Sequence, residues 1–315
     1  MNPRLKVIAA GQGGVFSRAQ AFSCGYTREQ LRERLGDGRW QKVRYGQYAE
    51  RVDLGHLAPW DRETWRHRQL AYAVANSMRP GTVALSHHSA LVLHGVPLWG
   101  VGLGEVQISR LDGRRGGLIA GVRHHRGKLP ATELTEVEGL TATTVPRALA
   151  ETACTTSFEA IVVSADAVLR AHHLSAEAVL QMLDRIEFWP GSATARAALS
   201  FADPLSESVG ESRLRVLLHN QGFPTPMLQA EFEDSDGFIA RVDFYFPDHR
   251  TVVEFDGLVK YAGGSREVLV QEKVREDRLR ALGLEVVRFT WADLARPTDV
   301  AVRIRRAFAR ARPAA

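Results

Sequence analysis

Apolar and polar residues alternate over three stretches in the last third of the chain. Alternation is expected of strands, because successive side chains of a strand point to opposite faces. Longer stretches with apolar residues three or four apart flank them and predict helices. The expected elements are helix 206–220, strands 227–232, 239–246 and 251–256, helix 267–282, strand 284–290 and helix 300–312. Gly283 is a suitable C-cap for the second of these helices.

Acidic side chains interrupt the apolar pattern of two neighbouring predicted strands. Asp243 points away from its apolar neighbours, and Glu254 and Asp256 project from one face of the next strand. Buried carboxylates are costly unless something neutralises them, and a divalent cation with oxygen ligands does so. The spacing Asp-x(10)-Glu-x-Asp therefore predicts a site for Mg²⁺ or Mn²⁺, with Glu211 on the leading helix as a further ligand.

Such a site is suited to phosphodiester hydrolysis, in which the ion activates water and stabilises the charge on the phosphoryl group. Basic assistance is expected from Lys260, just past the strand, or from Lys273 on the following helix. On that helix Asp277 interrupts an apolar stripe, so it is expected to face an enclosed polar group. A structural cluster of salt bridges, in a fold that binds DNA without cutting it, is the alternative for all these acidic residues.

The acidic pattern resembles the signature of PD-(D/E)XK nucleases, with one departure. That signature has lysine two residues after the glutamate, where this chain has Asp256. An acidic residue there resembles a subgroup related to very-short-patch-repair endonucleases, as do Glu254-Phe-Asp-Gly257, residues 272–280 and residues 287–291. The resemblance spans most of residues 206–310. It implies a restriction-endonuclease-like domain of order α-β-β-β-α-β-α and metal-dependent cleavage of DNA.

The first fifty residues combine two short helical patterns with a hairpin. Ser17 is expected to cap the first helix, and Thr27 to cap the second in a capping box with Gln30. Two extended pieces, residues 40–43 and 47–49, follow. Two helices joined by a turn and followed by a hairpin are the order of a winged helix-turn-helix.

The basic excess of the chain lies in the same segment. Residues 1–51 hold 10 Lys/Arg against 4 Asp/Glu, a net charge of +6, whereas the whole chain carries +5. A basic patch on a small module is typical of a polyanion-binding protein. The winged-helix interpretation predicts duplex DNA against the basic side chains of Arg28, Arg32, Arg39, Lys42 and Arg44. The alternative is a protein-interaction module whose arginines are only solvated.

Parts of this segment also resemble the N-terminal domain of AbiEi-family antitoxins, the antitoxin halves of type IV toxin–antitoxin systems. They are residues 14–21, Gly38-Arg-Trp40 and residues 44–48. This resemblance implies a winged helix that binds its own promoter and represses it. Residues 86–95 and 143–147 resemble the central part of the same family, which brings no known catalytic residue with it.

The middle of the chain has mixed helical and extended patterns. The expected elements are helices 63–77, 86–94, 146–152, 158–171 and 175–185 and strands 105–109 and 120–125. Adjacent histidines diverge on a helix and on a strand, so they are interpreted as hydrogen-bonded or surface side chains rather than zinc ligands. These pairs are His87-His88, His124-His125 and His172-His173.

Length and composition indicate the number of domains and the cellular environment. The chain of 315 residues has room for three domains, expected at 1–52, 53–203 and 204–315. The fold class is therefore a multidomain combination of α+β and α/β: a winged helix, a mixed α/β middle and a nuclease-like end. No apolar run approaches a membrane span. Only Cys24 and Cys154 are present, which indicates no disulfide framework and favours the cytoplasm.

Two functional hypotheses follow. In the first, the protein is a DNA-directed enzyme that cleaves double-stranded DNA with a metal ion at Asp243, Glu254 and Asp256. In the second, it is an antitoxin-like repressor whose nuclease-like fold recognises a partner, such as a cognate toxin. An RNA-directed nuclease is a third hypothesis.

Overall fold

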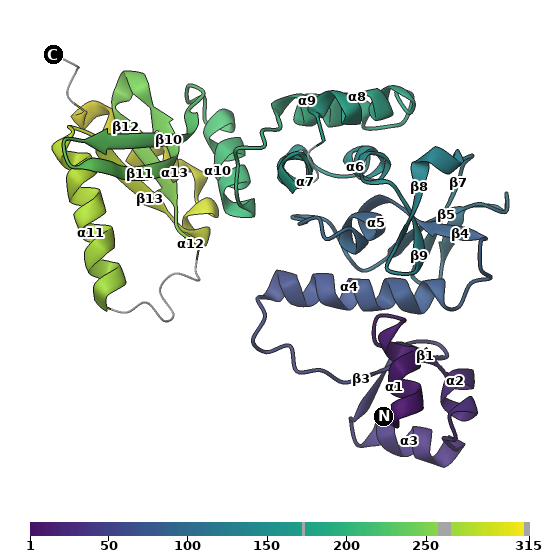
Figure 1. Cartoon of the computed structure of the whole chain (residues 1–315). Coiled ribbons are helices and arrows are strands. Elements are labelled where there is room, and N and C mark those ends of the chain that lie inside the picture. The colour runs from purple at the N-terminus through teal and green to yellow at the C-terminus, as the bar shows by residue number, and fades with distance from the viewer. Residues whose placement is uncertain (172–173, 258–265, 312–315) are drawn as a thin grey trace. The chain divides into compact units, whose positions relative to one another are not determined.

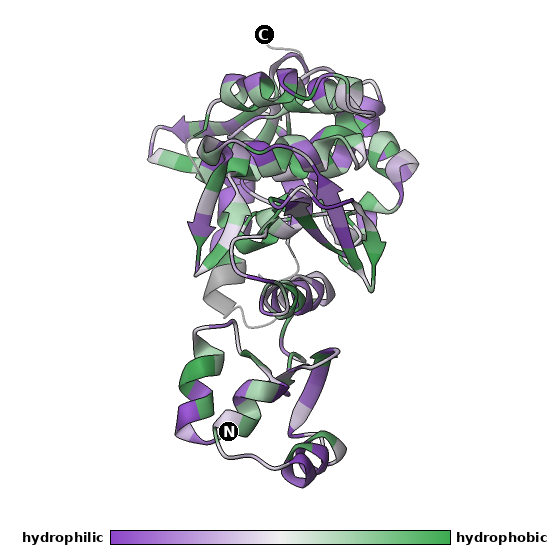
Figure 2. Cartoon of the chain, turned by 90° about the vertical axis from the view of Figure 1, so that its right-hand side faces the viewer, coloured by the Kyte–Doolittle hydropathy of each residue, from purple (hydrophilic) through white to green (hydrophobic). Residues whose placement is uncertain are grey.

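The computed structural model describes residues 1–171, 174–257 and 266–311, with helices and sheets in both halves of the chain (Figure 1). This confirms the expected mixed α and β multidomain class. Hydrophobic and hydrophilic residues are interleaved along most elements (Figure 2). Among the described residues, no helix combines the length and the apolar character that crossing a membrane requires.

The chain divides into two compact units. Unit 1 comprises Met1–Ile161 and Ser175–Ala197, and unit 2 comprises Val162–Leu174 and Ala198–Ala315. The first fifty residues and most of the middle segment therefore fall in one unit, and the acidic strands fall in the other.

Unit 1 begins with a small module of three helices and a three-stranded antiparallel sheet of order β1-β3-β2. Its elements are α1 (Pro3–Ala10), β1 (Val15–Ser17), α2 (Arg18–Ser23), α3 (Arg28–Gly36), β2 (Trp40–Arg44) and β3 (Gln47–Glu50). The capping box of Thr27 with Gln30 is confirmed, and Ser17 forms a second one with Gln20. Trp40 is at the centre of the module, with its ring 4.7 Å from that of Phe16.

The rest of unit 1 surrounds a six-stranded mixed sheet of order β6-β7-β5-β4-β9-β8. Its strands are β4 (Val83–Leu85), β5 (Val106–Arg110), β6 (Gly117–Ile119), β7 (Val122–Arg126), β8 (Leu134–Val137) and β9 (Leu140–Thr143). The helices are α4 (Pro59–Ala75), α5 (His87–Leu93), η1 (Ala131–Glu133), α6 (Val145–Ala153) and α8 (Ala176–Asp184), while α7 (Phe158–Ala171) and α9 (Ser192–Phe201) each cross a unit boundary. Strands β4, β6, β8 and β9, each of three or four residues, were not predicted.

A buried arginine connects two carboxylates in unit 1. Arg147 on α6 contacts Glu151 at 2.8 Å and Glu133 at 3.0 Å. Both carboxylates are almost fully buried, with 1% and 3% of their surfaces exposed. Glu133 also contacts Arg185, at 2.7 Å. Since a charge removed from water is costly unless it is paired, Arg147 neutralises a part of the core that would otherwise be strongly acidic.

Neutral histidines are buried beside this network. The ring of His67 binds the Ser89 hydroxyl and the Leu103 carbonyl, both at 2.8 Å, and burial lowers the pKa of His67 to about 4. Burial, followed by the charges of His88 and Arg147, lowers the pKa of His87 to about 3. Of the described histidines in the expected pairs, His87, His88 and His125 are hydrogen-bonded or stacked and His124 is partly buried on β7, while His172-His173 lies outside the described residues.

We expect unit 1 to lose stability in mild acid. A histidine whose pKa is lower in the folded state stabilises the fold fully above its unfolded pKa, near 6.5, and loses that contribution as the pH falls toward the folded value. At pH 5, His67 and His87 should each cost about 2 kcal/mol of unfolding free energy. Denaturant unfolding at pH 7 and pH 5 measures the loss. Equal stability at both pH values contradicts the prediction, and exposed His56→Ala should not alter it.

Unit 2 contains a four-stranded sheet of order β10-β11-β12-β13 with helices on both faces. Its elements are α10 (Val209–Asn220), β10 (Met227–Asp234), β11 (Gly237–Phe246), η2 (Pro247–His249), β12 (Thr251–Phe255), α11 (Arg266–Ala281), β13 (Glu285–Phe289), α12 (Trp291–Leu294) and α13 (Pro297–Arg310). The first three strands are antiparallel, and β12 and β13 are parallel. The predicted order α-β-β-β-α-β-α is confirmed, with the short α12 added.

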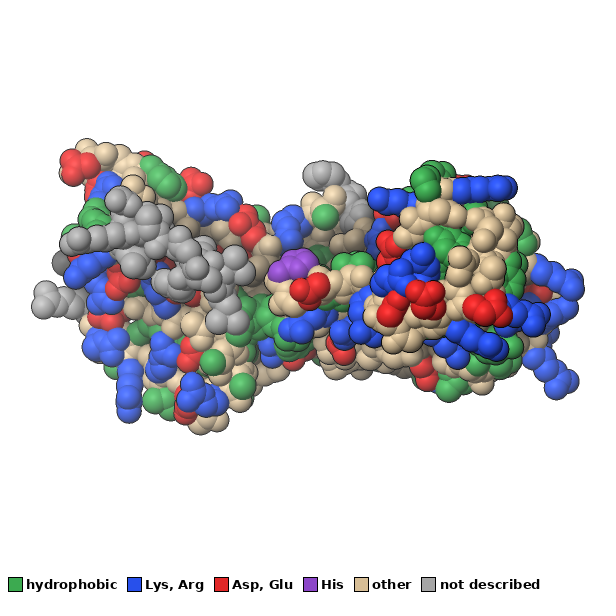
Figure 3. Space-filling model, turned by 90° about the horizontal axis from the view of Figure 1, so that it is seen from below, with side chains coloured by type: hydrophobic (Ala, Val, Ile, Leu, Met, Phe, Trp, Pro, Cys, Tyr) green, Lys and Arg blue, Asp and Glu red, His purple; other side chains and the backbone are tan. Residues whose placement is uncertain are grey.

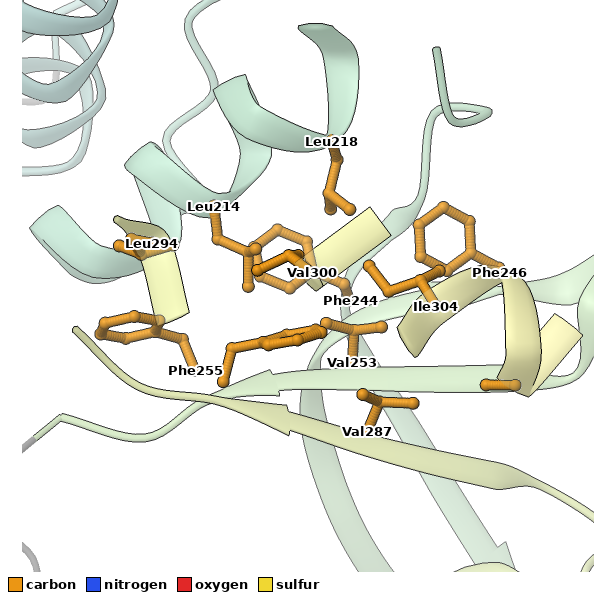
Figure 4. Packing of buried hydrophobic residues seen from close by; sticks show 12 residues of the cluster. Leu214, Leu218, Phe244, Phe246, Val253, Phe255, Val287, Leu294, Val300 and Ile304 are labelled. Carbon is orange, nitrogen blue, oxygen red and sulfur yellow. The ribbon is translucent and has the colours of Figure 1, made fainter. Parts of the chain in front are cut away.

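Each face of this sheet has its own core. Leu214 of α10 and Ile304 of α13 pack on Val253 and Phe255 (Figure 4). On the opposite face, Leu279 of α11 belongs to a second cluster with residues of β11, β12 and β13. Helix α10 approaches the sheet so closely that a methyl group on Gly210 would collide with the ring of Phe255. The side chains of Glu254 and Asp256, the neighbours of Phe255, therefore belong to the face covered by α11.

Candidate functional site

Two of the predicted acidic residues meet on adjacent antiparallel strands. Asp243 lies on β11 and Glu254 on β12, where Phe244 pairs with Val253. The Oδ2 atom of Asp243 accepts a hydrogen bond of 2.8 Å from the backbone N–H of Phe255. The charge of Asp243 also contributes to the electrostatic environment of Glu254. These two carboxylates therefore lie close together on neighbouring strands.

Arginines from two elements contact these carboxylates. The nearly buried side chain of Glu254 forms ion pairs with Arg275 of α11 and, at 3.1 Å, with Arg288 of β13. Arg288 lies beside Glu254 because the two residues pair in the parallel register of β12 and β13. It also approaches Asp256, with 3.7 Å between Nη1 and Oδ2. Glu254 and Asp256 therefore share one guanidinium group.

Helix α11 adds two more carboxylates to the same group. Glu272 contacts Arg275 at 2.7 Å and also contacts Arg288, while Glu276 lies 3.4 Å from the Nε atom of Arg288. We call the full set the acidic cluster. Its members are the carboxylates Asp243, Glu254, Asp256, Glu272 and Glu276 and the guanidinium groups Arg275 and Arg288. Glu276 also forms an ion pair with Arg280 of the same helix, at 2.8 Å.

Burial and the ion pairs of the acidic cluster act together on the pKa values of its members. Burial raises the pKa of Glu254 despite the opposing effects of Arg275 and Arg288. Burial alone would lower the pKa of Arg288, but its hydrogen bond to Glu272 and the surrounding carboxylates raise it. The two arginines are thus held firmly in their charged form, while burial remains the largest influence on the pKa of Glu254.

The acidic cluster is an ion-pair network in this arrangement. Among the residues that the structure describes, no three His, Cys, Asp or Glu side chains are grouped so as to hold a metal ion. Carboxylate oxygens are suitable ligands for Mg²⁺ or Mn²⁺. In this arrangement, however, Arg275 and Arg288 contact the Glu254 carboxylate that would have to bind the ion. A metal site here requires these contacts to rearrange.

The other predicted residues of this site lie in different surroundings. Glu211 is buried, and its Oε2 atom accepts hydrogen bonds from the Glu207 N–H at 2.8 Å and the Gln229 amide at 3.2 Å. It therefore organises the start of α10, and burial raises its pKa. Lys273 is exposed on α11, and Lys260 lies outside the described residues.

The expectation for Asp277 is wrong. Its side chain is exposed, and the apolar stripe that it was expected to interrupt is also exposed, at 55% for Val270 and 53% for Val274. The buried face of α11 instead contains Leu279 and the half-buried Arg275. Because α11 packs on carboxylates, it turns arginine side chains toward the sheet. Its apolar stripe faces the solvent, whereas such a stripe usually faces the core.

Arg275 and Arg288 are the site residues that the sequence interpretation missed. The positions of both arginines relative to their neighbours in the sequence already indicated the direction of their side chains. Arg275 lies three residues after Glu272, which places both on one side of a helix. Arg288 alternates with the apolar Val287 and Phe289 of its strand, so it must point to the opposite face.

The predicted DNA-binding residues of the N-terminal module differ in their availability. Arg28 and Arg32 are exposed on α3, and Lys42 is exposed on β2. Figure 3 shows Lys and Arg side chains interspersed with Asp and Glu on the molecular face seen from below. Arg39 is exposed but contacts carboxylates, with Glu33 at 2.8 Å and Asp37 at 2.5 Å.

Arg44 is partly buried, unlike the other four. Burial lowers its pKa, and its Nη1 atom is inaccessible to solvent and has no hydrogen-bond partner in the part of the chain that the structure describes. Its charge acts on His124 of the neighbouring sheet. Arg44 therefore faces the interior of unit 1 more than an external surface.

Relatives of this chain exist in Mycobacterium tuberculosis. "Uncharacterized protein MT2308" of strain CDC 1551 / Oshkosh and "Uncharacterized protein Rv2248" of strain ATCC 25618 / H37Rv are each 28% identical to it over 291 residues. The match covers 91% of this chain and 99% of each relative, so the similarity includes both units. No protein-family model matches the sequence.

Proposed function

We propose that the protein binds duplex DNA through a winged helix-turn-helix formed by residues 1–52. The observation that carries this proposal is a basic helix, α3, which follows α2 after a short turn and precedes the hairpin β2–β3. Arg28 and Arg32 are exposed on this helix, near the end that would enter a major groove. The net charge of +6 over residues 1–51 supports a polyanionic partner.

A double substitution tests the DNA-binding proposal. Arg28→Ala with Arg32→Ala should weaken duplex binding by about tenfold or more and reduce the salt slope of log K by about 1.8, because two phosphate contacts are lost. The matched control is Arg115→Ala with Lys128→Ala, which removes two exposed positive charges from elsewhere in unit 1. Mobility-shift titrations at several salt concentrations give both quantities. Equal effects in the two double variants contradict the proposal.

Metal-dependent phosphodiester cleavage by unit 2, in a restriction-endonuclease-like fold, is a second candidate function. The carboxylates gathered in the acidic cluster favour it, because a hard divalent cation prefers oxygen ligands. Asp243, Glu254 and Asp256 would hold Mg²⁺ or Mn²⁺, which when bound activates water and screens phosphoryl charge. Arg275 and Arg288 would have to release Glu254 and would then be positioned to attract the phosphate group.

A repressor without cleavage activity is the competing hypothesis. It is favoured by the arginine contacts of Glu254 and Asp256, which neutralise part of the cluster without any ion. In that case the N-terminal module would act as an antitoxin-like DNA-binding domain, and unit 2 would recognise a partner such as a toxin. Cleavage assays on DNA and on RNA distinguish these hypotheses.

A further inference from the structure

A basic cleft opens in unit 1 between strand β2, the segment that follows β3, and helix α4. Its volume is about 640 Å³. Four cationic side chains, one carboxylate and one indole ring contribute to its lining: Lys42, Arg51, Arg62, Arg66, Asp53 and Trp65. These residues come from three separate segments, so the cleft exists only in the folded unit.

The positive charges of this cleft are not balanced from within it. None of its four cations forms an ion pair among the residues that the structure describes. Asp53, the carboxylate in the lining, accepts a hydrogen bond from the Gly55 N–H at 2.8 Å. The Nε atom of Arg62 is buried and has no hydrogen-bond partner among the described residues, which is costly for a charged donor. The cleft therefore holds four cationic side chains without a described carboxylate partner, a combination suited to an anion.

Its remaining groups are suited to a nucleobase. Trp65 is half-buried and offers an indole ring beside the two arginines of α4. At the base of the cleft, the Gln41 amide donates to the Oε1 atom of Gln69 at 3.2 Å. An aromatic ring next to guanidinium groups is the combination that binds an unpaired base together with its phosphate.

We propose that this cleft binds a short stretch of single-stranded nucleic acid. The arginines and Lys42 contact successive phosphates, and Trp65 stacks on a base. A duplex keeps its bases stacked inside the helix and cannot offer one to Trp65, whereas a single strand can. The proposed duplex contact of α3 uses Arg28 and Arg32, which do not line the cleft, so this inference does not depend on it. Lys42, which the winged-helix interpretation also assigns to duplex DNA, is left unchanged in the test variants.

Fluorescence anisotropy with a labelled oligothymidine of about 15 nucleotides tests the proposal. Arg62→Ala with Arg66→Ala in the full chain should weaken binding and reduce the salt slope by about 1.4, from the loss of two single-strand phosphate contacts. Trp65→Leu should weaken binding by about tenfold while leaving that slope unchanged. The control Arg115→Ala with Lys128→Ala should retain wild-type affinity, and circular dichroism should show that every variant is folded.

The proposal is overturned by an unchanged affinity in the Arg62/Arg66 variant, by an equal loss in the control, or by no binding of the oligonucleotide by the wild type. Competition experiments distinguish binding of a nucleic-acid strand from binding of a small phosphate-containing ligand. Inorganic phosphate or a mononucleotide that displaces the strand at concentrations near the Kd of the strand would assign the cleft to a small ligand instead. The Arg28/Arg32 variant should bind the single strand normally, so failure of the duplex proposal remains distinguishable from failure of this one.

Discussion

Asp243→Ala combined with Glu254→Ala is expected to abolish the Mg²⁺-dependent plasmid cleavage proposed for unit 2. The two carboxylates lie on adjacent strands and are central to the acidic cluster, so both contributions to a bound ion are lost. Metal-assisted stabilisation is worth several kcal/mol, and a loss of about 4 kcal/mol corresponds to roughly a thousandfold in rate. Conversion of supercoiled to nicked or linear plasmid measures the effect.

Controls make the cleavage result specific. Glu231→Ala with Asp277→Ala removes two exposed carboxylates of unit 2 outside the acidic cluster and should cut at the wild-type rate. Glu254→Gln retains the shape of the side chain but should be nearly inactive, because a neutral amide is a poor ligand for a hard cation. Cutting that persists in the Asp243/Glu254 variant eliminates this site. A wild-type protein that cuts neither DNA nor RNA favours the repressor hypothesis.

Arg147→Ala is expected to destabilise unit 1 by about 3–5 kcal/mol. The substitution leaves Glu151 without its arginine, and Glu133 retains only Arg185. Burial already raises the pKa of Glu151, and Arg147 is the strongest opposing influence. The variant can relieve the unpaired charge only by taking up a proton, so its deficit should shrink as the pH falls from 8 to 6. Urea unfolding followed by circular dichroism measures both effects.

An exposed ion pair provides the comparison. Arg196→Ala removes the partner of Asp184 on the surface of unit 1, where both side chains are about half exposed. That substitution should cost at most about 1 kcal/mol, because exposed pairs are screened by water and salt. A similar loss in both variants would mean that the Arg147 network contributes no more than surface charge does.

Local patterns predicted much of the architecture. Alternation located strands β10, β11, β12 and β13, and side-chain chemistry located the helix starts at Ser17 and Thr27. These features depend on neighbours within a few residues, so the sequence alone contains them. Strand alternation also placed Glu254 and Asp256 on one face, where both approach Arg288.

The partners of those carboxylates depend on contacts that span the chain. Arg288 reaches Glu254 only because β13 pairs in parallel with β12, and Arg275 arrives from a helix on the opposite face to α10. Helix amphipathicity gave the wrong prediction for Asp277, since α11 covers charged groups as well as apolar ones. The basic cleft was missed for a related reason, because Lys42, Arg51 and Arg62 belong to different elements.

The contact of Gly210 with the ring of Phe255 links two features that were described separately. Phe255 lies between Glu254 and Asp256 in the sequence. Because helix α10 packs on the Phe255 ring, the position of the helix affects the position of Phe255. It thereby also affects the distance between the two carboxyl groups. One added carbon atom at Gly210 would push the helix and the strand apart. Gly210→Ala would therefore disturb the spacing of Glu254 and Asp256 from the opposite face of the sheet without altering any charge.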